Sequence, residues 1–114
     1  MHVGVRKVAD VVIVDLDGDL VAGDGDELLR EVCTELVAEG WRKILVNLAR
    51  VGRMDSSGVG ELVAGWKLAK EFGAAIKLLR PGDRVKSTLH LSQLLPLVEV
   101  YEDEADALRH LGAS

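Results

Sequence analysis

The chain has 114 residues, with 14 Lys and Arg against 19 Asp and Glu, so its formal charge is −5. This length, with a hydrophobic content of 48%, predicts one folded domain over residues 1–114 and excludes a disordered chain. The negative charge disfavours a direct nucleic-acid-binding role. The single cysteine, Cys33, excludes an intramolecular disulfide and leaves too little sulfur for a Cys-based metal centre.

The same features indicate where the protein works. A lone cysteine fits a reducing compartment. No stretch reaches the roughly 18 apolar residues of a membrane span, and residues 1–10 contain no apolar signal segment. We therefore expect a cytoplasmic protein without membrane attachment.

The first half of the chain predicts two strands and a helix. Residues 11–14, with Leu16, are apolar and β-branched, which is typical of a buried strand, and residues 3–8 are expected to pair with it as an edge strand. A helix is expected after Asp24, whose side chain can cap it while Glu27 reaches back. Its apolar stripe is Leu28, Leu29, Val32, Cys33, Leu36 and Val37, and Gly40 supplies the left-handed residue that ends it.

The second half repeats the alternation. Residues 44–48 predict a buried strand, and after a loop over 49–54 a helical stripe begins at Val59 and ends before Gly73. Residues 74–79 predict a third core strand, 83–94 a short helix ended by Pro96, and 97–101 the last strand. The inner face of the terminal helix is expected to consist of Ala105, Leu108 and Leu111.

Strands that alternate with helices indicate an α/β fold joined by right-handed crossovers. We expect a mostly parallel sheet of four to five strands, with the helices packed mainly on one side. In such sheets, functional residues gather in the loops beyond the carboxyl ends of the strands. The loop after Leu48 is therefore the first place to look for a site.

That loop leads into Asp55-Ser56-Ser57-Gly58-Val59-Gly60. The turn places two hydroxyls at a helix N-terminus, where backbone N–H groups lack partners, so Asp55 or Ser56 can serve as an N-cap and a phosphate is also accommodated. Gly58 and Gly60 each cost up to about 1 kcal/mol relative to Ala inside a helix. Their presence in the first turns predicts that another backbone or a partner comes close there.

On these residues the chain resembles the STAS-domain anti-sigma-factor antagonists. The turn from Met54 to Gly60, after a buried strand and at the start of a helix, looks like the phosphorylation site of that family. The order of elements over residues 8–111 is similar as well, and residues 84–89 resemble the family's short helix after the third core strand. The resemblance thus covers nearly the whole chain and implies a STAS-like fold.

The resemblance implies a switch and not an enzyme, with no catalytic residue, cofactor or metal. The serine that directly follows the aspartate accepts phosphate, which here is Ser56. The partner is an anti-sigma factor that is also a serine kinase and carries the ATP. Unphosphorylated protein would bind this kinase and release a sigma factor. Phosphorylation would weaken the complex through added negative charge, and a PP2C-type phosphatase would reverse it.

The neighbouring residues receive roles from the same resemblance. Asp55 has two interpretations: a helix cap, or a group that orients Ser56 and later repels its phosphate. Ser57 is expected to be a structural residue of the first turn, while Gly58 and Gly60 permit close approach by the kinase. The expected partner-binding residues are Asp55, Ser57, Gly58, Gly60 and Arg53.

One departure from the family pattern leaves alternatives open. The family usually carries Gly-x-Leu-Asp before the first helix, and Val21 stands here at the position of that Asp. A non-phosphorylated STAS scaffold of a signalling complex is therefore one alternative. A second is a receiver-like phosphoacceptor at Asp55, which the absence of any lysine after Lys86 disfavours.

The charges are unevenly distributed along the chain. Residues 1–39 hold 3 basic and 10 acidic side chains, residues 40–98 hold 10 and 4, and residues 99–114 hold 1 and 5. Ser56 lies in the basic part, with Arg50 and Arg53 before it. We therefore expect a locally positive surface around the turn that suits an ATP-carrying kinase and the transferred phosphate.

Overall fold

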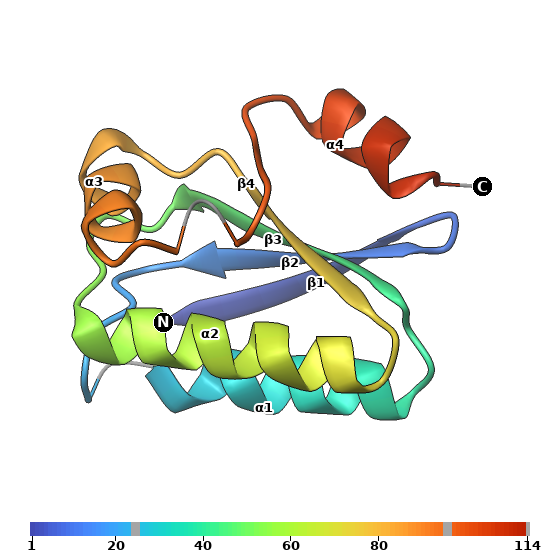
Figure 1. Ribbon diagram of the computed structural model, residues 1–114, viewed down its shortest axis with the longest axis horizontal. Helices are drawn as coiled ribbons and strands as arrows, with labels where there is room; N and C mark the ends of the chain where they lie inside the picture. Colours follow the sequence, from blue (N-terminus) through green and yellow to red (C-terminus); the bar gives the residue numbers. More distant parts are fainter. Residues whose placement is uncertain (24–25, 95–96, 114) are drawn as a thin grey trace.

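The computed structural model of the protein describes residues 1–23, 26–94 and 97–113. Its five strands form one sheet in the order β1-β2-β3-β4-β5, in which β1 runs antiparallel to β2 and the remaining pairs are parallel (Figure 1). The elements are β1 His2–Val8, β2 Val11–Asp17, α1 Asp26–Ala38, β3 Lys43–Arg50, α2 Ser56–Glu71, β4 Ala75–Leu79, α3 Asp83–Leu91, β5 Val100–Tyr101 and α4 Glu104–Leu111. The expected mostly parallel α/β sheet is confirmed.

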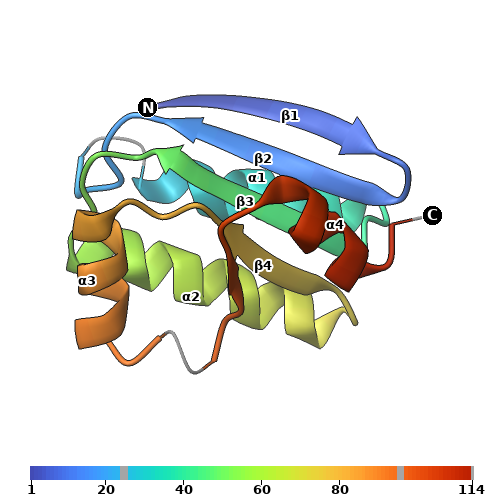
Figure 2. The same ribbon diagram turned by 90° about the horizontal axis from the view of Figure 1, so that it is seen from above.

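Both faces of the central strands are buried, which explains their continuous apolar sequence. In β2, Val12 and Val14 belong to a core that includes residues of α1 and α2, whereas Val11 and Ile13 pack with residues of α4. This division follows from the two-residue period of a strand. Figure 2 shows α1 and α2 on one side of the sheet and α4 on the other.

The two large helices pack closely because a glycine meets a small side chain. A Cβ atom added to Gly65 of α2 would lie 3.4 Å from the Sγ atom of Cys33 in α1. Cys33 is buried, and this burial raises the pKa of its thiol to about 11. Cys33 is therefore a small core residue, as its place in the apolar stripe predicted.

The expected helix and strand ends are confirmed in part. Gly40 and Gly73 adopt the left-handed φ values of 99° and 72° just beyond α1 and α2. The helix expected over 83–94 ends at Leu91, because Gln93 has a left-handed φ of 59° and the N–H of Leu94 turns back to the carbonyl of Leu89. The expected cap at Asp24 and the break at Pro96 lie outside the described residues.

Two expectations near the C-terminus are correct only in part. The strand expected over 97–101 is reduced to Val100–Tyr101, because Leu97 and Val98 donate backbone hydrogen bonds to Leu94 in a turn. The inner face of α4 is formed by Ala107 together with the expected Leu108 and Leu111, whereas the expected Ala105 is exposed. Asp103 caps α4 by accepting a hydrogen bond from the N–H of Asp106. The helix therefore starts at Glu104, and this start determines which of its side chains face the sheet.

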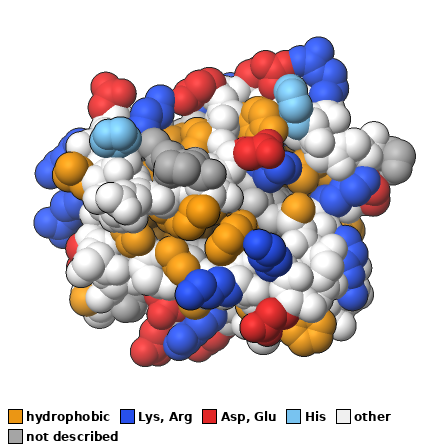
Figure 3. Space-filling view, viewed as in Figure 1, with side chains coloured by type: hydrophobic (Ala, Val, Ile, Leu, Met, Phe, Trp, Pro, Cys, Tyr) orange, Lys and Arg blue, Asp and Glu red, His pale blue; other side chains and the backbone are white. Residues whose placement is uncertain are grey.

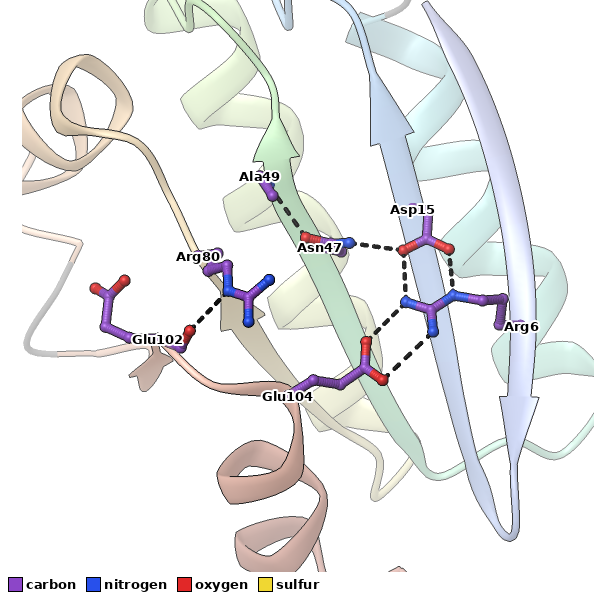
Figure 4. Close-up of polar contacts among 7 residues, drawn as sticks. All are labelled: Arg6, Asp15, Asn47, Ala49, Arg80, Glu102 and Glu104. Carbon is purple, nitrogen blue, oxygen red and sulfur yellow. Dashed lines mark hydrogen bonds and ion pairs between the residues drawn. The ribbon is translucent and has the colours of Figure 1, made fainter.

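A network of charged side chains joins α4 to the first two strands (Figure 4). The Arg6 guanidinium donates hydrogen bonds to both carboxylate oxygens of Asp15, with distances of 2.5 and 2.9 Å from Nε and Nη2, and to Oε1 of Glu104 at 2.8 Å. Asn47 donates to Asp15 at 2.8 Å. Among the described residues, no helix is long and apolar enough to cross a membrane.

Candidate functional site

The candidate site is the start of α2, which follows β3 after a short loop. Asp55 is the N-cap, because its Oδ1 atom accepts a hydrogen bond from the N–H of Gly58 at 3.0 Å. The choice between Asp55 and Ser56 as cap is thereby decided in favour of Asp55. Ser56 is the first helical residue and is exposed, whereas Ser57 is half-buried.

Asp55 also holds the neighbouring loop, residues 18–23, against the start of α2. Its Oδ2 atom accepts a hydrogen bond from the N–H of Ala22 at 3.0 Å, and its own N–H donates to the carbonyl of Leu20 at 3.3 Å. The hydrogen bonds from the N–H groups of Ala22 and Gly58 hold the pKa of the Asp55 carboxyl below its usual value. Asp55 therefore remains ionised at neutral pH as a link between two loops.

Further backbone contacts join the same two loops. The N–H of Leu20 donates to the carbonyl of Arg53 at 2.9 Å, Leu20 forms a parallel bridge with Met54, and the N–H of Gly18 donates to the carbonyl of Arg50 at 3.2 Å. These contacts extend the pairing of β2 with β3 beyond the strand ends. The sequence contained no signal for this pairing, since it depends on backbone atoms of residues that are far apart in the chain.

The two glycines of the turn have different surroundings. A Cβ atom on Gly58 would lie 2.1 Å from the carbonyl oxygen of Leu20, so the protein's own loop occupies the space beside this buried glycine. The expectation that another backbone comes close is thereby confirmed for Gly58, whereas its contact with a kinase stays a prediction. Gly60 is exposed and has no heavy atom of the described chain within 4 Å of its added Cβ, so its surface is open to a partner.

The arginines before the turn are paired with acidic side chains. Arg50 approaches Asp17 at 3.6 Å, and Arg53 approaches Asp19 at 3.5 Å. Asp17 is the last residue of β2 and Asp19 lies just beyond it, so both carboxylates stand beside the arginines at the end of the neighbouring strand and offset part of their charge. The locally positive surface expected around Ser56 stays a prediction, and these two ion pairs reduce the charge that the arginines supply to it.

The serine hydroxyls lack partners that would activate them for catalysis. Within the described residues, neither Ser56 nor Ser57 donates a side-chain hydrogen bond to a histidine or a carboxylate. No group of three or more His, Cys, Asp or Glu suited to a metal ion occurs in the part of the chain that the structure describes. Val21, at the departure from the family pattern, is half-buried beside the bridge formed by Leu20.

Comparisons with known proteins identify the family. An anti-sigma F factor antagonist of Paenibacillus polymyxa is 27% identical over 101 residues, which cover 89% of this chain and 86% of the relative. The crystal structure of TM1081 from Thermotoga maritima aligns with a TM-score of 0.89 and 26% identity over 96% of this chain and 94% of that one.

The anti-sigma factor antagonist SpoIIAA of Bacillus shares the fold in two forms. Its unphosphorylated form aligns with a TM-score of 0.80 and 24% identity over 99% of both chains, and its phosphorylated form with 0.72 and 23% over 96% of this chain and 99% of that one. A model of the STAS domain matches residues 2–107. The chain therefore belongs to the STAS domain family, and the relative from Paenibacillus is an anti-sigma factor antagonist.

Proposed function

We propose that this protein is an anti-sigma factor antagonist that is switched by phosphorylation of Ser56. In the unphosphorylated state it binds an anti-sigma factor that is also a serine kinase, and a sigma factor is released. The kinase, which carries the ATP, phosphorylates Ser56, and the complex then dissociates. A PP2C-type phosphatase removes the phosphate and restores binding. The protein itself catalyses no reaction and works in the cytoplasm.

The observation that carries this proposal is the exposed position of Ser56 beside an ionised carboxylate. Ser56 lies at the first position of α2, and Asp55 next to it is held in place by the N–H groups of Ala22 and Gly58. A phosphate adds a charge of about −1.5 to −2 at this surface, which repels acidic groups of a partner and raises the cost of desolvation. The open surface at Gly60, one helical turn further along, supports partner contact in the same place.

The fold is suited to survive the modification. Ser56 is exposed, and the helix is capped by Asp55 and not by Ser56. The positive end of the helix dipole favours an anion at this position. We therefore expect phosphorylation to change binding and to leave the sheet intact. The two solved forms of SpoIIAA support the view that this fold accommodates a phosphate.

The test is to incubate the protein with an anti-sigma factor kinase from the same genome and ATP, and to measure phosphate incorporation. We expect labelling of the unmodified protein and of Ser57→Ala, which is the matched control, and no labelling of Ser56→Ala. The label should withstand hydroxylamine, since a phosphoserine does and an acyl phosphate on Asp55 does not. Undiminished labelling of Ser56→Ala would falsify the assignment of the acceptor.

A second measurement separates the switch from a scaffold. Ser56→Asp places negative charge at the acceptor position, and a switch should then lose most of its affinity for the kinase in a titration. Ser56→Asn, which has nearly the same shape and adds no charge, should retain it. Equal affinity of Ser56→Asp and unmodified protein would assign the chain to the scaffold class.

A further inference from the structure

The edge of the sheet formed by β1 is open. β1 spans seven residues and pairs with β2 alone, and in Figure 2 it forms the outer border of the sheet. In an antiparallel pair, only every second residue of a strand bonds to its neighbour, so the N–H and C=O groups of the other residues of β1 point away from β2. Such a row of backbone groups is a template on which an extended segment can add as a further strand.

An apolar groove runs beside this edge, between β1 and α1. Val3 and Val5 line it from the strand, and Leu28 and Val32 line it from the helix. Val5 is 46% exposed, although it lies in the middle of β1. An apolar groove next to a free strand edge allows an added strand to gain side-chain contacts as well as backbone hydrogen bonds.

The rim of this groove is acidic. Glu27, Glu31 and Glu35 follow one another at four-residue intervals along α1, Glu39 comes directly after the last residue of the helix, Ala38, and all four are exposed. Like charges at this spacing repel one another and destabilise a helix. No ion pair reaches any of the four from the residues that the structure describes. Glu35 and Glu39 line the groove itself, and so does Lys7, whose Nζ atom lies over the Trp41 ring at 5.6 Å from its centroid. Acidic side chains therefore outnumber Lys and Arg side chains in the lining, and the two glutamates are available to an occupant.

The charge decides which occupant fits. A second copy of the chain that pairs through its own β1 continues the same sheet, so its α1 lies on the same face and brings a second row of glutamates toward the first. An acidic segment is repelled for the same reason. A segment with Lys or Arg among small apolar residues meets both features, because its apolar side chains enter the groove while its cations reach Glu35 and Glu39.

We propose that the groove between β1 and α1 binds an extended, positively charged segment of a partner protein, which adds to the free edge of β1 and pairs with Glu35 and Glu39. This surface shares no residue with the start of α2. Binding here and phosphorylation of Ser56 are therefore separable, and the failure of one leaves the other untouched.

The first test is an NMR titration of the isotope-labelled full chain with an acetylated and amidated peptide, Lys-Thr-Val-Thr-Lys-Thr-Val-Thr-Lys. In an added strand this sequence presents its Lys and Val side chains to the groove and its Thr side chains to the other face. We expect shifted amide signals for β1 and for the groove face of α1, and an affinity that falls as salt is raised. The matched control peptide carries Glu in place of each Lys and should not bind.

Variants of the protein locate the contact. Glu35→Gln should raise the Kd of the basic peptide about threefold, as expected for one exposed ion pair, whereas Glu71→Gln removes the same charge from an exposed position on α2 and should leave it unchanged. Val5→Lys should abolish binding, because it removes an apolar contact from the middle of β1 and adds a second lysine beside Lys7 in the groove. Equal binding of the acidic peptide, or shifts that avoid β1, would overturn the proposal. The proposal would also be overturned if the protein dimerised with rising concentration and Val5→Lys prevented this, because the edge of β1 would then bind a second copy of the chain.

Discussion

At the scale of single residues, two glycines of one helical turn have opposite structural roles. By sequence alone Gly58 and Gly60 are equivalent, since both lower helix stability relative to Ala. In the structure, Gly58 is required by the carbonyl of Leu20, which leaves no room for a Cβ atom, whereas Gly60 faces open space. Gly58 is thus a structural residue, and Gly60 is the one that remains available for contact with a partner.

This difference predicts opposite effects of the same substitution. Gly58→Ala should lower the free energy of unfolding by about 1–3 kcal/mol, because the new methyl group forces the loop of Leu20 away from α2. Gly60→Ala should raise it by up to about 1 kcal/mol, since it improves helix propensity without a clash. Urea denaturation of both variants checks this. Similar destabilisation of the two would mean that the loop does not lie against Gly58.

At the scale of elements, α4 is held to the sheet by few contacts of two kinds. Ala107 and Leu111 pack on Val11, Ile13, Leu45 and Leu79. Arg6 bridges Glu104, in the first turn of α4, to Asp15 of β2 (Figure 4). These hydrogen bonds to Asp15 and Glu104 raise the pKa of Arg6 above its ordinary value. Because Arg6 and Glu104 are both partly exposed, the ion pair orients the helix more than it stabilises the whole protein.

We therefore predict that Arg6→Met loosens α4 while it changes the free energy of unfolding by less than about 1 kcal/mol. The methionine keeps an apolar stem but loses all hydrogen bonds to Asp15 and Glu104. Hydrogen exchange should become faster in α4 and remain unchanged in α2, which serves as the internal reference. Glu104→Gln, which spares the contact of Arg6 with Asp15, should give a smaller effect. Unaltered exchange in α4 would show that apolar packing alone holds it.

At the scale of the whole molecule, the lowered pKa values make stability depend on pH. Hydrogen bonds from Arg6 lower the pKa of Asp15, backbone N–H groups of Ala22 and Gly58 lower that of Asp55, and the hydroxyl of Tyr101 with Lys77 lowers that of Glu99. A carboxyl whose pKa is lower in the folded state stabilises the fold above its unfolded pKa. This contribution is lost as the pH falls through the folded pKa.

Accordingly, we expect the urea midpoint to fall on acidification from about pH 6 to about pH 3, since the ordinary values are 3.8 for aspartate and 4.5 for glutamate. Asp55→Asn should be less stable than the unmodified protein at pH 6 and should lose less stability on acidification, because one of the titrating groups is absent. A midpoint that rises toward pH 3 would contradict the lowered pKa values.

The charge of the whole molecule is distributed by element. The acidic excess of residues 1–39 includes the row of glutamates on α1, whereas α2 carries the exposed Lys67 and Lys70. Figure 3 shows Lys and Arg side chains over α2, next to hydrophobic side chains near the middle of that face. α1 thus holds four acidic residues against a single arginine, whereas α2 holds two Lys and two Glu and carries no net charge.

Much of the fold was determined by sequence alone, because strand and helix patterns are local. The apolar run at 11–14, the stripe over 28–37 and the left-handed glycines at 40 and 73 predicted β2, α1 and the helix ends correctly. The turn at Asp55 and Ser56 also identified the family, since it combines local capping chemistry with its place after a buried strand.

The tertiary structure decided what depends on atoms far apart in the chain. It showed that Asp55 bonds to Ala22, that Leu20 fills the space beside Gly58, and that Asp17 and Asp19 oppose Arg50 and Arg53. None of these contacts produces a periodic pattern in the sequence, because they join two loops that follow neighbouring strands. The sequence determined that a serine lies at the start of α2. The packing of the two loops determined which neighbouring residues support the fold and which remain free for a partner.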